Sequence, residues 1–255
     1  MNRLGLRPPS RIISANSTIL LGLGLLAALG GGGCGDDSRR AEPSGSAPTP
    51  AITEVDGAGE PLDDRPVLLV VGTSLTAGHG LDLSEAYPAV IQRKLDAAGL
   101  GYRVVNAGVS GETSAGALRR IDWLLRQPAE VLILETGAND GLRGQDPEAT
   151  RENIQSIFER VRLQEPPPKL VLMAMEALPN YGEDYRQMFR AIYPDLAEAN
   201  DALLIPFFLE GIAGDPELNL PDGIHPTAKG HERIAENLWT FLEPLLENPD
   251  PANAR

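Results

Sequence analysis

From Pro66 onward, the sequence alternates between short apolar runs and longer stretches with helical periodicity. The first run, VLLVVG at residues 67–72, is apolar at every position, as a strand covered on both faces of a parallel sheet requires. Strands that alternate with helices return to the same sheet by crossovers, which leaves the helices on both faces. The predicted fold class is therefore α/β with a parallel sheet. Further strands are expected at residues 102–106, 131–135, 169–175 and 202–206.

The intervening helices are marked by apolar residues three and four positions apart and by signals at their ends. Asp146-Pro147 is a typical helix start, with aspartate as the cap and proline at the first position. Gly99 is a stop signal after the periodic residues of the first long helix. The apolar periodicity predicts helices around residues 87–98, 118–125, 147–161, 176–200 and 234–245.

Residues 1–34 are interpreted as an export signal that ends at Cys34. Basic residues precede an apolar run at residues 18–29, which suits a signal peptide and is short for a bilayer span. Gly31-Gly32-Gly33-Cys34 resembles a bacterial lipoprotein processing site, at which the cysteine is lipidated. A plain secretory signal is the alternative, because Gly31 stands where such sites usually carry leucine. We expect a membrane-anchored lipoprotein facing the periplasm, or otherwise a periplasmic or secreted protein.

Composition sets the remaining boundaries and excludes some functions. Residues 35–64 are rich in Asp, Ser, Pro, Ala and Gly and are expected to form a disordered linker. The folded domain is expected at residues 65–248, followed by a short tail at 249–255. A net charge of −14 argues against nucleic-acid binding, and it leaves the lipid at Cys34 as the expected contact with a membrane. The single cysteine and the scattered histidines show no metal-binding spacing, so we expect neither a metal nor a cofactor.

Four polar blocks stand at the places where a parallel sheet of this kind binds ligands, beyond the carboxyl ends of its strands. The first block contains Ser74, directly after the first strand, where its hydroxyl can be exposed. The others follow the second and third strands and precede the last helix: residues 106–113, residues 135–141 and residues 222–226. Acyl transfer by a serine needs a base, an orienting carboxylate and donors for the oxyanion, and these blocks contain each kind of group.

Within these blocks, His225 is the candidate base and Asp222, three residues earlier, its carboxylate partner. Gly111 offers a backbone N–H without a side chain in the way, and Asn139 offers an amide donor to the same oxygen. Two further serine-enzyme patterns are absent at Ser74, the G-x-S-x-G elbow and the S-x-x-K arrangement. The other two histidines, His79 and His231, are expected at the surface.

The blocks resemble those of the GDSL, or SGNH, hydrolases, and in particular the branch of acyl-CoA thioesterase I, lysophospholipase and arylesterase. The resemblance covers about residues 66–246 and includes stretches beyond the four blocks, such as LPNYG at 178–182 and IPFF at 205–208. It implies a flavodoxin-like three-layer α/β/α sandwich with a five-stranded parallel sheet. It also implies the roles of several residues: a catalytic triad of Ser74, Asp222 and His225, an oxyanion hole of Ser74, Gly111 and Asn139, and a loop that closes over the acyl chain, at Gly141, Leu142, Arg143 and Gly144.

The activity implied by the resemblance is hydrolysis of a carboxylic ester or thioester through an acyl-enzyme on Ser74. The expected partner is a small-molecule substrate, and acyl or aryl esters, acyl thioesters and lysophospholipids all remain open. A carbohydrate deacetylase of the same fold is one alternative, and a non-catalytic binding lipoprotein is another. The sequence leaves the oligomeric state open.

One position departs from the family pattern. The first block reads Gly72-Thr73-Ser74-Leu75, where the family has G-D-S-L. A carboxylate at that position makes charge-assisted hydrogen bonds, whereas threonine offers one neutral hydroxyl and avoids desolvating an anion. We expect the groups around Thr73 to have changed with it, so that an aspartate restored at this position lowers both stability and activity.

Overall fold

All five strands of the sheet are parallel, in the order β2-β1-β3-β4-β5. The computed structural model describes residues 63–247, so the predictions for the export signal, for nearly all of the linker and for the C-terminal tail lie outside the described residues. The strands are β1 (Val67–Gly72), β2 (Arg103–Gly108), β3 (Val131–Glu135), β4 (Lys169–Met173) and β5 (Leu203–Ile205).

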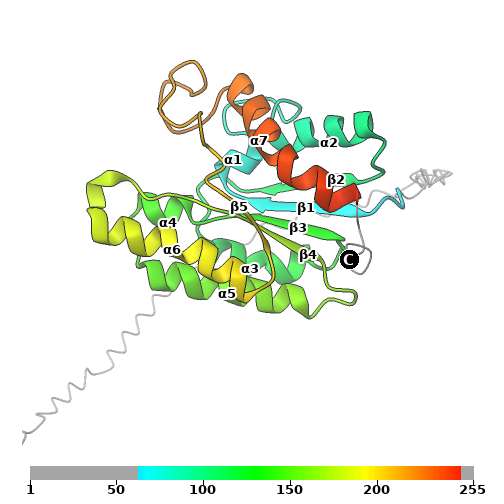
Figure 1. Cartoon of the computed structure of the whole chain (residues 1–255), viewed down its shortest axis with the longest axis horizontal. Helices are drawn as coiled ribbons and strands as arrows, with labels where there is room; N and C mark the ends of the chain where they lie inside the picture. Colours follow the sequence, from blue (N-terminus) through cyan, green and yellow to red (C-terminus); the bar gives the residue numbers. More distant parts are fainter. Residues whose placement is uncertain (1–62, 248–255) are drawn as a thin grey trace, which may run out of the picture. The chain divides into compact units, whose positions relative to one another are not determined.

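Helices cover both faces of this sheet, which confirms the three-layer α/β/α sandwich. Figure 1 shows α2 and α7 together on one face, and α3, α5 and α6 on the other. The long helices are α2 (Tyr87–Ala98), α3 (Ser114–Leu124), α5 (Pro147–Arg162), α6 (Glu183–Ala199) and α7 (Ala228–Glu247). Three short ones lie in the loops: α1 (Ser74–Ala77), α4 (Ala138–Leu142) and the 3₁₀ turn η1 (Pro179–Tyr181).

Two helix ends match their signals in the sequence, whereas α6 begins at Glu183 rather than near residue 176 and α7 begins at Ala228, before the expected residue 234. The Asp146 side chain accepts the N–H of Glu148 at 3.0 Å, which satisfies one of the free donors at the start of α5. At its C-terminal end, α2 stops at Gly99, which adopts the left-handed conformation with a φ of 70°, and glycine does so without strain.

The core lies on both faces of the inner strands of the sheet, and β1 and β3 show this most clearly. Every residue of β1 and of β3 is buried, because each of these strands has a neighbour on both sides and helices on both faces. Large side chains from the covering helices fill the two layers against them, among them Tyr87, Ile91, Leu95, Ile121, Phe158, Phe189 and Tyr193.

The strand order places a switch point between β1 and β3. The chain passes outward from β1 to β2 and then crosses back over β1 to reach β3, so the loops after β1 and β3 diverge. In open α/β sheets, ligands bind at such a point, beyond the carboxyl ends of the strands. The loops that carry Ser74 and Asn139 flank it.

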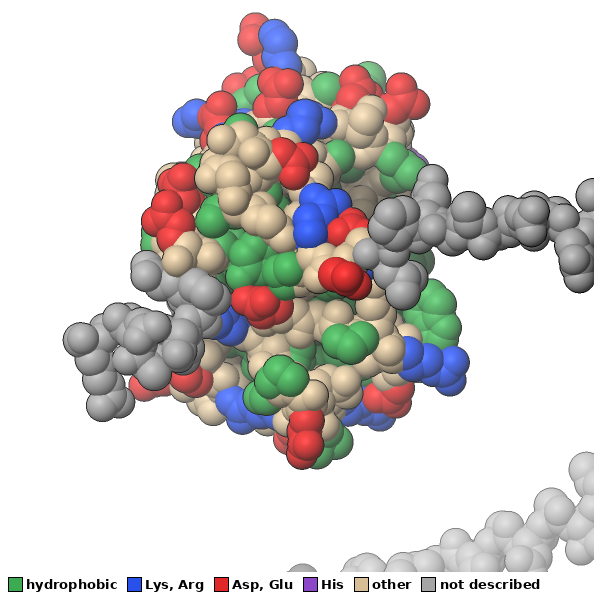
Figure 2. Space-filling model, turned by 90° about the vertical axis from the view of Figure 1, so that its right-hand side faces the viewer, with side chains coloured by type: hydrophobic (Ala, Val, Ile, Leu, Met, Phe, Trp, Pro, Cys, Tyr) green, Lys and Arg blue, Asp and Glu red, His purple; other side chains and the backbone are tan. Residues whose placement is uncertain are grey.

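The opposite end of the molecule, at the amino ends of the strands, has mixed charge. Figure 2 shows this face, on which acidic and basic side chains are interspersed with apolar ones. Among residues 63–247, no helix combines the length and the hydropathy that crossing a bilayer demands.

The short helix α1 packs directly on the end of β2, and we predict that this contact requires glycine at position 108. A Cβ at Gly108 would overlap the backbone of Thr76 and Ala77, which cannot move without displacing α1. We expect Gly108→Ala to cost about 1–3 kcal/mol of stability, as overpacking does, and to lower the melting temperature. Gly101→Ala is the matched control, because a Cβ there meets nothing within 4 Å. Equal melting temperatures for the two variants would contradict the prediction.

Candidate active site

Ser74 is the first residue of α1 and follows β1 after a single intervening residue. The intervening Thr73 caps the helix through its hydroxyl, which accepts the N–H of Leu75. At the first position of a helix, the Ser74 N–H has no partner within that helix. The turn thus leaves both the hydroxyl and the amide of Ser74 available at the edge of the sheet.

The loop between β5 and α7 brings His225 to Ser74. The His225 Nε2 lies 3.0 Å from the Ser74 Oγ, and the His225 Nδ1 lies 2.7 Å from the Asp222 Oδ2. Ser74 therefore forms one hydrogen-bonded chain with His225, 151 positions away in the sequence, and with Asp222. A serine, an imidazole and a carboxylate in this order have the geometry of a catalytic triad.

The Asp222 carboxylate is held by the turn that it begins. Its Oδ1 accepts the backbone N–H groups of His225 at 3.0 Å and of Ile224 at 2.9 Å. The backbone N–H of His225, its imidazole and then the Ile224 N–H hold the pKa of Asp222 well below its usual range. The carboxylate therefore stays ionised, fixes the imidazole orientation and can stabilise an imidazolium.

Three hydrogen-bond donors at this site remain available to a ligand. Gly111 has a φ of 78°, in the left-handed region, and within the described residues neither its amide nor that of Ser74 has a hydrogen bond. One hydrogen of the Asn139 amide is donated to the Glu112 carbonyl at 3.0 Å, which leaves the second available for a ligand. Two backbone amides and one side-chain amide at one site can stabilise an oxyanion.

These groups share a cavity of about 330 Å³. Ser74, Gly111, Asn139 and His225 line one part of its wall, and most of the remaining lining is apolar. The apolar side chains come from α1, α4, the segment after β4 and the segments before and after Asn219: Leu75, Ala138, Leu142, Met175, Leu178, Phe207, Leu209, Ala213 and Ile224. Among residues 63–247, no group of three His, Cys, Asp or Glu side chains could hold a metal ion.

The segment expected to close over an acyl chain, residues 141–144, is helical in its first half. Gly141 and Leu142 end α4, and Leu142 lines the cavity. Arg143 lies outside the cavity lining and donates to the Gly111 carbonyl at 2.9 Å. Gly144 has a φ of 61° and packs closely against Tyr181.

The expectation that His231 lies at the surface is wrong. Its side chain is 1% exposed, and its Nδ1 accepts the N–H of Tyr87, which ties α7 to the start of α2. Burial, and then the neighbouring charge of His225, lower the pKa of His231 to about 4, so it is neutral. The signal was present in the sequence, because His231 shares the apolar face of α7 with Ile234 and Leu238.

His79 is exposed, as expected, but it also belongs to the site. Its ring lies 4.4 Å from that of His225, measured between centroids, and it lines the same cavity. It extends the polar side of the cavity wall beyond the triad. Its position after the Gly72–Gly78 turn did not reveal this contact, because the loop of His225 comes from the other end of the chain.

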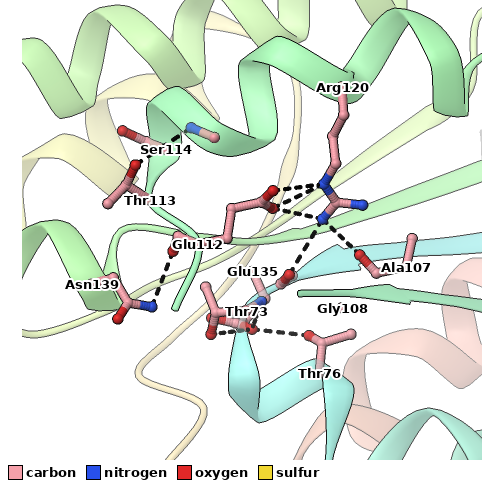
Figure 3. A network of polar contacts seen from close by, with 12 residues as sticks. Thr73, Thr76, Ala107, Gly108, Glu112, Thr113, Ser114, Arg120, Glu135 and Asn139 are labelled. Carbon is pink, nitrogen blue, oxygen red and sulfur yellow. Dashed lines mark hydrogen bonds and ion pairs between the residues drawn. The ribbon is translucent and has the colours of Figure 1, made fainter. Parts of the chain in front are cut away.

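A buried carboxylate anchors the Ser74 turn, in which Thr73 stands where the family pattern has aspartate. Glu135, at the end of β3, accepts the Thr73 N–H at 2.7 Å, the Thr73 hydroxyl at 2.9 Å and the Thr76 hydroxyl at 2.9 Å (Figure 3). The Thr76 oxygen also lies 2.7 Å from the Tyr87 hydroxyl, which completes a buried polar chain. No pattern in the sequence indicated this role for Glu135, apart from the position of a charged residue at the end of an apolar strand.

Burial raises the pKa of Glu135 to about 7, and the hydrogen bonds from Thr73 and Thr76 offset part of that shift. A carboxyl group whose pKa is raised in the folded state keeps its proton after the unfolded chain has lost it. Its contribution to stability is therefore complete below the ordinary value of 4.5 and disappears as the pH rises through about 7.

We predict that Thr73→Asp lowers both melting temperature and kcat, because it sets a second carboxylate against Glu135 where a hydroxyl now donates. Two facing carboxylates cannot both ionise without a cost, so the loss of stability should be larger at pH 8 than at pH 5. Thr73→Ser retains the hydroxyl and is the matched control. A Thr73→Asp variant that is more active and at least as stable as the wild type would contradict this account.

Comparisons with known proteins identify a family for the chain. The model of the GDSL-like lipase/acylhydrolase family matches residues 70–233. Esterase TesA of Pseudomonas aeruginosa is 42% identical over 180 residues, which cover 70% of this chain and 89% of that protein. The thioesterase 1/protease 1/lysophospholipase L1 of Escherichia coli is 39% identical over 183 residues, or 71% of this chain and 85% of that one.

Solved structures give the same result. A crystal structure of TesA matches with a TM-score of 0.67 and 40% identity, over 70% of this chain and 99% of that one. The SGNH-hydrolase family esterase AlinE4 matches with a TM-score of 0.60 and 42% identity, over 74% of this chain and 98% of that one. From the matched family model, the relatives and the shared fold, the chain belongs to the GDSL-like lipase/acylhydrolase family.

Proposed function

We propose that this protein hydrolyses carboxylic esters or thioesters with an apolar acyl chain, through an acyl-enzyme on Ser74. The observation that carries the proposal is the chain from Ser74 through His225 to Asp222 at the wall of an apolar cavity of about 330 Å³. Membership of a family of esterases and thioesterases supports the reaction class.

In the first step, the Ser74 Oγ attacks the acyl carbonyl while the His225 Nε2, 3.0 Å away, takes the hydroxyl proton. Negative charge develops on the carbonyl oxygen, where the amides of Ser74, Gly111 and Asn139 stabilise it. The tetrahedral intermediate then expels the alcohol or thiol, which receives the proton from His225. The acyl group stays on Ser74 as an ester.

In the second step, His225 takes a proton from water as that water attacks the acyl-enzyme. The same donors stabilise the second oxyanion, and the proton returns to the Ser74 Oγ as the carboxylic acid leaves. Asp222 keeps the imidazole oriented throughout, because its Oδ2 holds the Nδ1 at 2.7 Å and its Oδ1 is fixed by two backbone amides.

The cavity favours an acyl chain as the group that is recognised. Nine apolar side chains line it and offer burial to hydrocarbon. Beyond the triad and the oxyanion donors, its polar side chains are His79, Ser110, Glu176 and Asn219, so a carbohydrate deacetylase fits this mainly apolar wall less well. A non-catalytic binding protein fits less well too, because every member of the triad is present and in hydrogen-bonding reach. Relatives named as a thioesterase and lysophospholipase and as an arylesterase make acyl thioesters, lysophospholipids and aryl esters the leaving-group classes to compare.

We predict that a fluorophosphonate labels Ser74 and abolishes hydrolysis of p-nitrophenyl esters. Activity per enzyme should rise with acyl length from acetate and fall once the chain exceeds the cavity; acyl-CoA and lysophospholipid substrates are compared in the same assay. Ser74→Ala should lose labelling and activity, whereas Ser84→Ala, at an exposed serine, retains both. Labelling retained in Ser74→Ala would rule out Ser74 as the nucleophile, and a preference for acetylated sugars would favour the deacetylase.

We further propose that the chain is exported and anchored by a lipid on Cys34. The support is the sequence pattern alone: a basic start, an apolar run of signal length and a cysteine after small residues, all outside the described residues. A linker of about thirty residues would then separate the anchor from the hydrolase domain, so that the cavity could reach substrates away from the membrane surface.

The anchoring proposal predicts a result for the full-length protein expressed in a bacterial host. When the cells are extracted with detergent and the phases are separated, the protein partitions into the detergent phase. Cys34→Ser removes the lipidated thiol and should leave a soluble or unprocessed form, while the Ser74→Ala variant partitions like the wild type. Recovery of all wild-type protein in the soluble periplasmic or medium fraction would favour the plain secretory signal.

A further inference from the structure

The Arg120 side chain, on α3, reaches back from its helix to the carboxyl edge of the sheet. Its Nη2 donates to the Ala107 carbonyl at 2.7 Å (Figure 3). Over a longer contact of 3.4 Å, it also donates to the Gly72 carbonyl. Ala107 is near the end of β2, and Gly72 ends β1, two residues before Ser74. One guanidinium therefore joins the ends of two neighbouring strands beneath the site.

The same guanidinium pairs with Glu112. The Arg120 Nε lies 2.8 Å from one carboxylate oxygen of Glu112, and the Nη2 lies 2.6 Å from the other. This bidentate pair is largely buried, with side-chain exposures of 20% for Arg120 and 9% for Glu112. The Glu112 side chain crosses the first turn of α3 so closely that a Cβ at Gly116 would lie 2.6 Å from its Cγ. The glycine makes room for the pair.

Glu112 connects this pair to the donors above Ser74. Its backbone carbonyl accepts one hydrogen of the Asn139 amide at 3.0 Å, and Gly111 precedes it directly in the chain. With its side chain held by Arg120 and its carbonyl facing Asn139, Glu112 fixes the segment that presents the Gly111 N–H. The segment has a second attachment on its other side, where Arg143 donates to the Gly111 carbonyl at 2.9 Å.

We propose that Arg120 and Glu112 are positioning residues that set the geometry of the oxyanion site. Neither side chain lines the cavity, so neither touches the substrate. Through its contacts with the end of β1, the end of β2 and Glu112, Arg120 ties the strand that leads into Ser74 to the segment that carries Gly111 and orients Asn139. The inference rests on the proposed hydrolase activity and assigns two further residues to it.

A guanidinium is required for this arrangement, because it must serve a carboxylate and a carbonyl at once. A lysine ammonium retains the charge but is a single point donor, without the planar fork that meets both oxygens of a carboxylate. Arg120→Lys therefore tests the geometry with the charge kept, and Glu112→Gln tests the charge with the shape kept. A misplacement of about 1 Å in a catalytic group costs up to about 10²-fold in rate.

The experiment measures kcat and KM on a p-nitrophenyl ester for both variants, with active enzyme counted by fluorophosphonate titration. We expect kcat per titrated site to fall by about 10-fold or more while KM stays within about twofold, because the oxyanion donors act on charge that develops in the transition state. Affinity for an alkylboronic acid, which forms a tetrahedral adduct on serine, should fall in parallel with kcat/KM.

Asp122→Asn is the matched control. Asp122 is on the same helix as Arg120 and pairs with Arg160 at 2.7 Å, but both side chains are at the surface, 68% and 40% exposed. This control should retain the wild-type kcat and KM. Melting temperatures show whether each variant is folded, and Arg120→Lys keeps the test available if the loss of one buried charge in Glu112→Gln unfolds the protein.

A double-mutant cycle with Asn139→Ala separates positioning from general support. Asn139→Ala alone should cost about 10²–10³ in kcat, as the loss of an oxyanion donor does. If Glu112 acts through that site, Glu112→Gln costs less in the Asn139→Ala background than in the wild type. Equal losses in both backgrounds, or a folded variant with the wild-type kcat per titrated site, overturn the inference. A wild type that hydrolyses no ester would instead contradict the proposed function.

Discussion

The buried Glu135 carboxylate joins the ends of two neighbouring inner strands, β1 and β3, and the active site is built on that junction. It stands at the end of β3 and accepts the amide and hydroxyl of Thr73, which follows β1. The turn that presents Ser74 is thereby fixed by two short hydrogen bonds from Thr73 to this carboxylate, of 2.7 and 2.9 Å. Burial raises the pKa of this carboxyl group to about 7, because removing the charged form from water is unfavourable. The hydrogen bonds from Thr73 and Thr76 offset part of that cost, so all three side chains must stay closely packed.

Around this junction, the site divides into two parts with different physical demands. The polar part, from Asp222 to the oxyanion donors, has to be rigid, since its value depends on donors that are already oriented when charge appears. Backbone amides hold Asp222, and buried ionic or polar contacts hold the segments of Ser74 and Gly111. The apolar part is the cavity, whose side chains come from loops and short helices, the elements that vary most easily in such folds.

Particular residues show where reasoning from the sequence succeeds and where it fails. The strands β1 and β3 were predicted at their observed bounds, because a strand buried on both faces must be apolar throughout. The helices α1 and α4, of four and five residues, are too short for a period of 3.6 to appear. His231 was expected at the surface, although its place on the apolar face of α7 indicated burial.

The sequence by itself determined the sheet, the order of the four polar blocks along the chain and the kinds of chemical group that meet at the strand ends. Periodicity and short motifs are local properties, so they can be read without coordinates. Only the tertiary structure decided that Glu135 faces Thr73, that Arg120 reaches Glu112 and two strand ends, and that His79 lies beside His225. Glu135 and Thr73 stand 62 positions apart, and contacts over such separations depend on how helices and strands pack, which no local pattern encodes.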